Sequence, residues 1–108
     1  MEVSTQLAID LPMSALEEFC QCWQIQELAV FGSVLRDDFS PSSDVDFLYV
    51  LMPKVLWNLG DLIKAEEELA KIMGRRVDLV SKKSIQRSHN WLRRKNILST
   101  AKVIYAQK

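Results

Sequence analysis

The chain is poor in the residues that build disulfide scaffolds and flexible linkers. It has two cysteines, three glycines and three prolines among 108 residues, and its 14 basic and 14 acidic side chains cancel. Cys20 and Cys22 are too close along an expected helix to form a disulfide, and without a second pair they do not make a zinc site. We therefore expect reduced thiols and neither a disulfide framework nor structural zinc.

The sequence also lacks an apolar run of about 18 residues and an N-terminal signal pattern, so we expect a cytoplasmic protein without a membrane span. Its 48% hydrophobic content can form one core but hardly two. We expect a single domain over residues 1–108, with no room for an accessory helical domain that would bind the substrate.

Charge is unevenly distributed along the chain. Residues 1–70 carry 3 basic and 13 acidic groups, whereas residues 71–108 carry 11 basic groups and one acidic group. The second part can attract a triphosphate, RNA or an acidic partner, or it can form an exposed helix face that balances the acidic part. The basic side chains concerned are Lys82, Lys83, Arg87, Arg93, Arg94 and Lys95. Trp91 among them can stack on a base or anchor a helix to the core.

Apolar patterning predicts alternating helices and strands. A first amphipathic helix is expected from Pro12 to about Trp23, and a second from Leu59 to Met73, where Gly74 ends it. A basic helix is expected at residues 85–98. Strands are expected at 28–31, 45–51, 76–80 and 102–105, the last at an edge. This order predicts a mixed α/β (α+β) fold, a small twisted sheet with helices packed on one side.

The most informative spacing joins Gly32-Ser33 to Asp44 and Asp46. The Gly-Ser pair follows an apolar strand and precedes Val34-Leu35-Arg36, which is typical of a short helix start. Glycine lets the backbone approach a phosphate, and the serine hydroxyl and helix-start amides can donate hydrogen bonds to it. Alone the pair is an ordinary turn, but its distance from the paired acids favours a phosphate-binding loop.

Asp44 and Asp46 flank Val45 in an expected strand, which places their side chains on one face with Cα atoms roughly 6 to 7 Å apart. Two such carboxylates repel each other and lose hydration unless cations or a water-filled cleft compensate. Oxygen ligands favour Mg²⁺ or Mn²⁺ over zinc. Two such ions about 4 Å apart stabilise the attacking and leaving oxygens of an in-line displacement. The pattern therefore predicts nucleotidyl or phosphoryl transfer.

The stretch from Phe31 to Phe39, followed by Ser42 to Phe47, resembles the signature of the DNA polymerase β-like nucleotidyltransferases. It is most similar to the minimal nucleotidyltransferases, whose members are about this short. The resemblance extends from Leu28 to about Tyr105. It implies the nucleotidyltransferase fold of the polymerase β palm.

By this resemblance, Asp44 and Asp46 are two catalytic metal ligands, and the third acid of the family falls on Asp78. Together they would hold two Mg²⁺ ions, and Asp78 would also take the proton of the acceptor hydroxyl. The alternative for Asp44 and Asp46 is a solvated loop end. The same alternative holds for Asp78, which is flanked by Val77, Leu79 and Val80.

The resemblance also implies how ATP is held. Ser33 would contact the triphosphate, with Gly32 permitting the approach, and Arg36 and Ser43 would be supporting phosphate contacts. Arg36 has an alternative as a surface ion pair with Asp37 or Asp38.

Minimal family members are similar to the antitoxin half of two-gene modules whose toxin is a helical ribonuclease of the HEPN type. The resemblance therefore implies a protein adenylyltransferase that transfers AMP from Mg-ATP to a tyrosine of the cognate toxin and neutralises it. We expect no direct binding to nucleic acid. Two alternatives stay open: an antitoxin that acts by binding alone, and a nucleotidyltransferase that acts on a small molecule or an RNA end.

Overall fold

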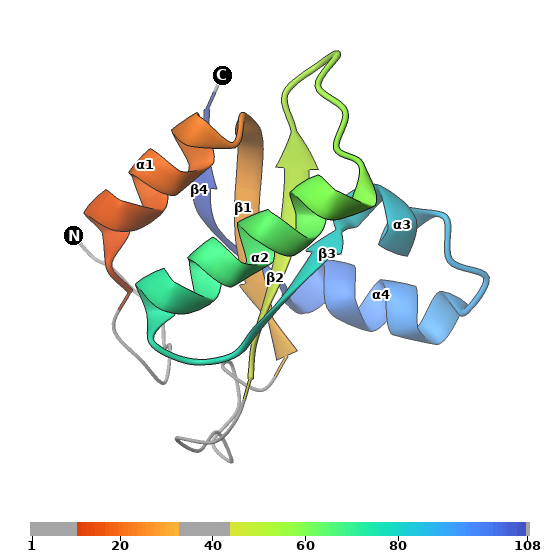
Figure 1. Cartoon of the computed structure of the whole chain (residues 1–108). Coiled ribbons are helices and arrows are strands. Elements are labelled where there is room, and N and C mark those ends of the chain that lie inside the picture. Colours follow the sequence, from red (N-terminus) through yellow and green to blue (C-terminus); the bar gives the residue numbers. More distant parts are fainter. Residues whose placement is uncertain (1–10, 33–43, 108) are drawn as a thin grey trace.

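The computed structural model describes residues 11–32 and 44–107 of the chain. Helices and strands alternate along these residues (Figure 1). In chain order the elements are α1 (Met13–Cys22), β1 (Ile25–Phe31), β2 (Val45–Leu51), α2 (Leu59–Met73), β3 (Val77–Ser81), α3 (Lys82–Gln86), α4 (Trp91–Thr100) and β4 (Lys102–Ala106).

The strands form one mixed sheet in the order β3-β2-β1-β4. β1 pairs antiparallel with β2 and β4, whereas β2 and β3 are parallel and are connected by the crossover helix α2. β4 lies at an edge, as expected from the sequence. The predicted mixed α/β fold with a small sheet is therefore confirmed.

Local signals fix the bounds of α2. The Asn58 side chain accepts a hydrogen bond from the Asp61 N–H at 2.7 Å, and Asp61 accepts one from the Asn58 N–H at 3.0 Å. This capping box satisfies amide groups that have no partner within the helix. At the other end Gly74 adopts the left-handed conformation with φ 71°, and its N–H donates to the Ala70 carbonyl. The predicted span of the second helix is confirmed.

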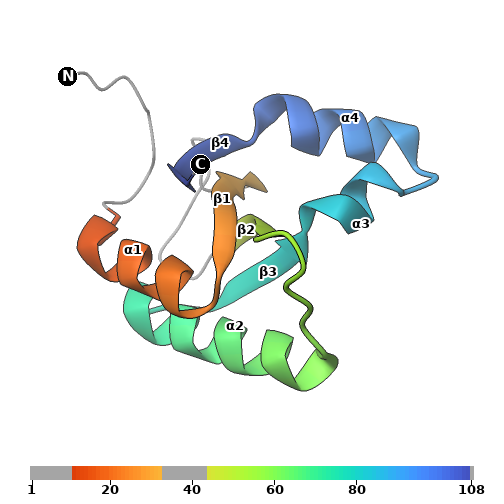
Figure 2. The same ribbon diagram turned by 90° about the horizontal axis from the view of Figure 1, so that it is seen from above.

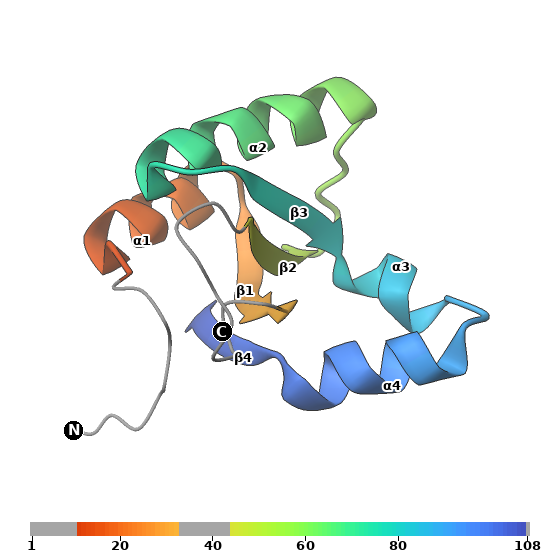
Figure 3. The same cartoon turned by 90° about the horizontal axis from the view of Figure 1, so that it is seen from below.

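Helices cover both faces of the sheet, not one. α1 and α2 pack on the face that buries Val30, Phe47 and Leu79. Ile85 of α3 and Ile97 of α4 pack with Ala29, Phe31 and Leu48 on the other face. Figure 2 shows the two helix pairs on opposite sides of the strands, and Figure 3 shows the same from below. The expectation of one covered side is wrong because β1 and β2 carry apolar residues on both faces.

The expected basic helix over residues 85–98 is two helices. α3 ends at Gln86 and α4 begins at Trp91. The Asn90 side chain accepts a hydrogen bond from the Arg93 N–H, and the Asn90 N–H donates to the Ser88 hydroxyl. Polar side chains that bond to nearby backbone in this way compete with the helix and end it. The Arg94 guanidinium donates to the Ser88 carbonyl at 2.6 Å and ties the turn to α4.

Within the described ranges, no helix is long and apolar enough to cross a bilayer.

Candidate active site

Asp46 and Asp78 lie side by side on the α3/α4 face of the sheet. They are register partners in the parallel pairing of β2 with β3, whose strands are about 4.8 Å apart. Their neighbours Phe47 and Leu79 point into the core beneath α1 and α2, so the two carboxylates share the opposite face. Asp46 is half-buried and Asp78 is exposed. The position that the family resemblance gave for the third acid is therefore adjacent to the second.

Gly32 directly follows β1 and lies against the Asp46 carboxylate. Its φ is +80°, a left-handed conformation that favours glycine. A Cβ at this position would overlap Asp46 Oδ2 and would lie 3.3 Å from Cγ. Glycine is thus required both by the backbone conformation and by the close approach of the carboxylate.

Asp44 lies just before β2 rather than within it. Its Oδ1 is 3.4 Å from Arg76 Nε, and the Val45 N–H donates to the Arg76 carbonyl at 3.1 Å. The side chains of Arg76 and Asp44 are 87% and 40% exposed, so the ion pair contributes only about 0 to 1 kcal/mol and can open at little cost. Sequence reasoning missed this contact, because only the β2/β3 register reveals that Asp44 is opposite Arg76.

Glu66 makes a second contact that sequence reasoning missed, a hydrogen bond to the backbone of β3. From α2, its Oε2 accepts a hydrogen bond of 3.0 Å from the backbone N–H of Leu79, which directly follows Asp78. β3 is an edge strand, so this N–H would otherwise lack a partner in the sheet. Glu66 lines a hollow of about 330 Å³ together with Asp44 and Asp78. The helix thus holds the edge strand at the position of the third acid.

The donor set of the three acids fits a divalent cation. Carboxylate oxygens are the ligands that Mg²⁺ prefers, and Asp46 and Asp78 present theirs from adjacent strands. Among the residues that the structure describes, no three carboxylate, imidazole or thiolate side chains are gathered into one metal-binding group. The strand register therefore places Asp46 and Asp78 side by side, but the described side chains do not form a complete three-ligand group.

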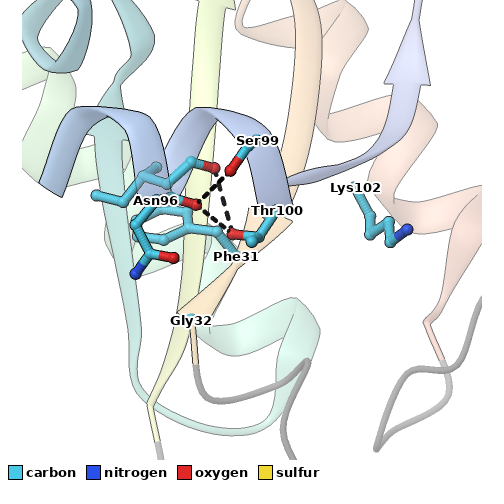
Figure 4. Close-up of a pocket in the computed structure, with 7 residues that line it drawn as sticks. Phe31, Gly32, Asn96, Ser99, Thr100 and Lys102 are labelled. Atoms are coloured by element: carbon cyan, nitrogen blue, oxygen red, sulfur yellow. Dashed lines mark hydrogen bonds between the residues drawn. The ribbon is translucent and has the colours of Figure 1, made fainter. Parts of the chain in front are cut away.

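A hollow of about 440 Å³ opens beside Gly32, between β1 and α4 (Figure 4). Asn96, Thr100 and Lys102 line it, and the Thr100 hydroxyl donates to the Asn96 carbonyl at 2.6 Å. Sequence reasoning did not connect these residues with the site, because they come near Gly32 only when α4 packs across the sheet.

Three predicted phosphate contacts, Ser33, Arg36 and Ser43, lie outside the described residues. Of the basic side chains, Lys82 forms a half-buried ion pair of 3.0 Å with Glu27 of β1 and so ties α3 to the sheet. Arg93 and Lys95 on α4 are exposed.

Comparison with known proteins identifies the family of this chain. The profile of the nucleotidyltransferase domain matches residues 13–104. The protein adenylyltransferase MntA of Thermococcus cleftensis is 36% identical over 72 residues, which are 65% of this chain and 69% of that protein.

Solved structures share the fold. One structure, described as a minimal nucleotidyltransferase, matches with a TM-score of 0.62 at 28% identity. The match covers 82% of this chain and 85% of the chain in that structure. A second solved structure is the complex of a tri-AMPylated Shewanella oneidensis HEPN toxin with an MNT antitoxin. The match to one chain of this complex has a TM-score of 0.60 at 15% identity and covers 88% of this chain and 70% of that chain. The resemblance seen in the sequence is thus confirmed, and this chain belongs to the nucleotidyltransferase domain family.

Proposed function

We propose that this chain transfers AMP from ATP to a tyrosine hydroxyl of a HEPN-type ribonuclease toxin and thereby neutralises the toxin. The observation that carries the proposal is the register of Asp46 with Asp78, next to the left-handed Gly32. The similarity to a protein adenylyltransferase and to a chain from a HEPN toxin complex supports the choice of donor and acceptor. The enzyme would act in the cytoplasm, where ATP and Mg²⁺ are available.

In the proposed reaction, the tyrosine oxygen forms a bond to the α-phosphorus of ATP. The bond from that phosphorus to the bridging oxygen breaks, and pyrophosphate leaves with the electron pair. Asp78 is exposed on the reacting face and would take the proton of the hydroxyl. Asp44, Asp46 and Asp78 would hold two Mg²⁺ ions, which when bound would lower the pKa of the acceptor hydroxyl and neutralise the departing pyrophosphate.

The remaining residues would position the nucleotide. Gly32, whose missing Cβ leaves space for the Asp46 carboxylate, would let the backbone approach the triphosphate closely. Ser33 would donate a hydrogen bond to the triphosphate, and Arg36 and Ser43 would be supporting contacts. Glu66 would keep β3, and with it Asp78, opposite Asp46.

The test is to incubate this chain with ATP, Mg²⁺ and the HEPN-type protein encoded by the neighbouring gene, and to measure the intact mass of the latter. We expect AMP-sized increments and loss of ribonuclease activity. Asp44→Asn combined with Asp46→Asn should abolish both effects. Glu18→Gln, which removes an exposed carboxylate of α1 on the other face of the sheet, is the matched control and should change neither.

Two outcomes would contradict the proposal. If the double variant neutralised the toxin as well as the native chain does, the chain would act by binding alone. If labelled ATP modified small molecules or RNA ends but not the protein, the acceptor would be wrong while nucleotidyl transfer would stand.

A further inference from the structure

Helix α4 leaves most of its surface uncovered. Ile97 is its buried residue, whereas Trp91 and Leu92 at its first turn are 59% and 63% exposed. Figure 2 shows α4 on the outer side of the sheet, away from α1 and α2. Exposed tryptophan and leucine beside arginine are typical of protein interfaces, where aromatic and Arg side chains are enriched.

A groove runs along α4 to the candidate active site. One hollow of about 560 Å³ is lined by Leu92, Arg93 and Lys95, and a second of about 440 Å³ reaches Gly32. The two hollows are adjacent, since Asn96 and Ser99 line both of them (Figure 4 shows the hollow at Gly32). We call this the α4 groove. It connects the exposed first turn of α4 with the residue that abuts the Asp46 carboxylate.

The α4 groove is positively charged. Arg93, Lys95 and Lys102 line it, and none of the described residues that line it is acidic. Neighbouring cations are occupied within the fold, since Arg94 bonds to the Ser88 carbonyl and Lys82 to Glu27. The charge that the α4 groove offers is therefore complementary to an acidic segment.

We propose that the α4 groove docks an acidic, tyrosine-bearing segment of the acceptor protein and directs its hydroxyl to Asp46 and Asp78. The transfer part of this inference rests on the proposed function, whereas the binding part does not. We favour a protein segment because Trp91 and Leu92 together add apolar surface beside the cations. A base of an RNA strand could instead stack on Trp91, and the test below distinguishes the two partners.

The test uses the full chain and two fluorescent peptides of equal length, each with one tyrosine, flanked in one by glutamates and in the other by lysines. Binding is measured by fluorescence anisotropy. From the complementary charge, we expect the native chain to bind the acidic peptide about tenfold more tightly than the basic one. Arg93→Glu with Lys95→Glu should reverse this preference.

The matched control is Lys64→Glu with Lys71→Glu, which makes the same charge change at exposed positions of α2 on the other face of the sheet. It should keep the preference of the native chain. Position 93 lies in the first turn of α4, where the helix dipole stabilises a negatively charged side chain. The test variant should therefore fold. Trp91→Ala is an independent variant and should weaken binding of the HEPN-type protein about tenfold.

Transfer gives a second readout. With the HEPN-type protein as acceptor, the Arg93/Lys95 variant should raise KM for the protein but not KM for ATP. The docking proposal would be overturned if the Arg93/Lys95 variant had the same peptide preference and the same KM for the acceptor protein as the Lys64/Lys71 control. Tighter binding of an RNA oligonucleotide than of the acidic peptide through the same two residues would also overturn it. Specific peptide binding without AMP transfer to any acceptor would instead overturn the proposed function and leave the docking site standing.

Discussion

The two faces of the sheet differ in what they bury and in what they expose. The face under α1 and α2 is closed by large apolar side chains such as Phe19, Phe47 and Leu69, each at most 1% exposed. The face under α3 and α4 has a smaller apolar cluster, and Asp46 and Asp78 lie on it. We infer that stability is concentrated on the first face, which we call the closed face. We call the face that carries Asp46 and Asp78 the open face.

The strands make this division possible because consecutive residues point to opposite faces. In β2, Phe47 packs into the closed face while Asp46 lies on the open one. A substitution in a strand can therefore affect stability without activity, or activity without stability, depending on which face of the sheet the substituted side chain points to.

The largest expected effect is on activity at the open face. Asp46→Asn should lower AMP transfer by about 10³-fold, since under the proposed function it would remove a charged metal ligand worth several kcal/mol in the transition state. Thermal unfolding should change little, because Asp46 is half-buried and outside the core. Transfer assays and calorimetry on the same preparation check this. A large loss of stability would show that the two faces are not separable in this way.

The closed face should show the opposite behaviour. Leu69→Ala, at a fully buried position of α2, should lower the free energy of unfolding by about 3 to 5 kcal/mol, because it removes apolar contacts and leaves a cavity. Ile97→Ala on α4 is the comparison on the open face and should cost about 2 kcal/mol, at the lower end of the range for such substitutions. Urea titrations measure both, and equal losses would contradict the proposed concentration of stability on one face.

Two left-handed glycines sharpen the comparison further. Gly74→Ala should cost about 1 kcal/mol of stability from backbone strain alone, since nothing lies within 4 Å of its missing Cβ. Gly32→Ala has a similar φ but overlaps the Asp46 carboxylate, so it should lower transfer by about tenfold to 100-fold as well. Equal transfer rates for the two variants would argue against a contact between Gly32 and a catalytic carboxylate.

The remaining effect appears only at alkaline pH and concerns the buried Cys20 of the closed face. Burial, and then the negative charge of Glu17, raise the pKa of its thiol from 9.0 to about 12. In the unfolded chain the thiol ionises near its ordinary pKa, so folding keeps it protonated and stability is fully present below about pH 8.5. Between that pH and about 12, stability should fall by up to about 1.4 kcal/mol per pH unit.

Urea titrations at pH 8 and pH 10 measure this loss, and Cys20→Ala should remove its thiol-dependent part. Burial also raises the pKa of Tyr49, which both proteins share, so its contribution cancels in the difference. Burial, and then the charges of Cys20 and Glu17, raise the pKa of Tyr105, so the difference between the two proteins includes the part of that shift that depends on Cys20. The exposed Cys22 is the internal control for access, and should react with a maleimide much faster than Cys20 does at pH 8. Similar labelling rates would mean that the closed face opens readily.

Features that depend on neighbours in the chain were predictable. Asn58 and Gly74 fix both ends of α2 through bonds to nearby backbone, so the predicted bounds agree with the structure. The basic helix is divided at Ser88 and Asn90 by hydrogen bonds that are equally local. The division was not predicted, because the pattern on both sides of it is typical of one continuous helix. The second helix layer was missed because Leu48 and Ile97 reveal it only when distant segments meet.

The sequence by itself determined the family and the candidate site residues: a glycine-serine pair, two acids separated by one residue, and a third acid in a later strand. Only the tertiary structure decided that Asp78 lies opposite Asp46, that Gly32 touches that carboxylate, and that α4 forms a groove leading to it. The physical reason is the separation along the chain between the residues that interact. Residue types and local hydrogen bonds are set within a few residues, whereas strand register and helix packing are set by burying apolar surface between segments far apart in the chain.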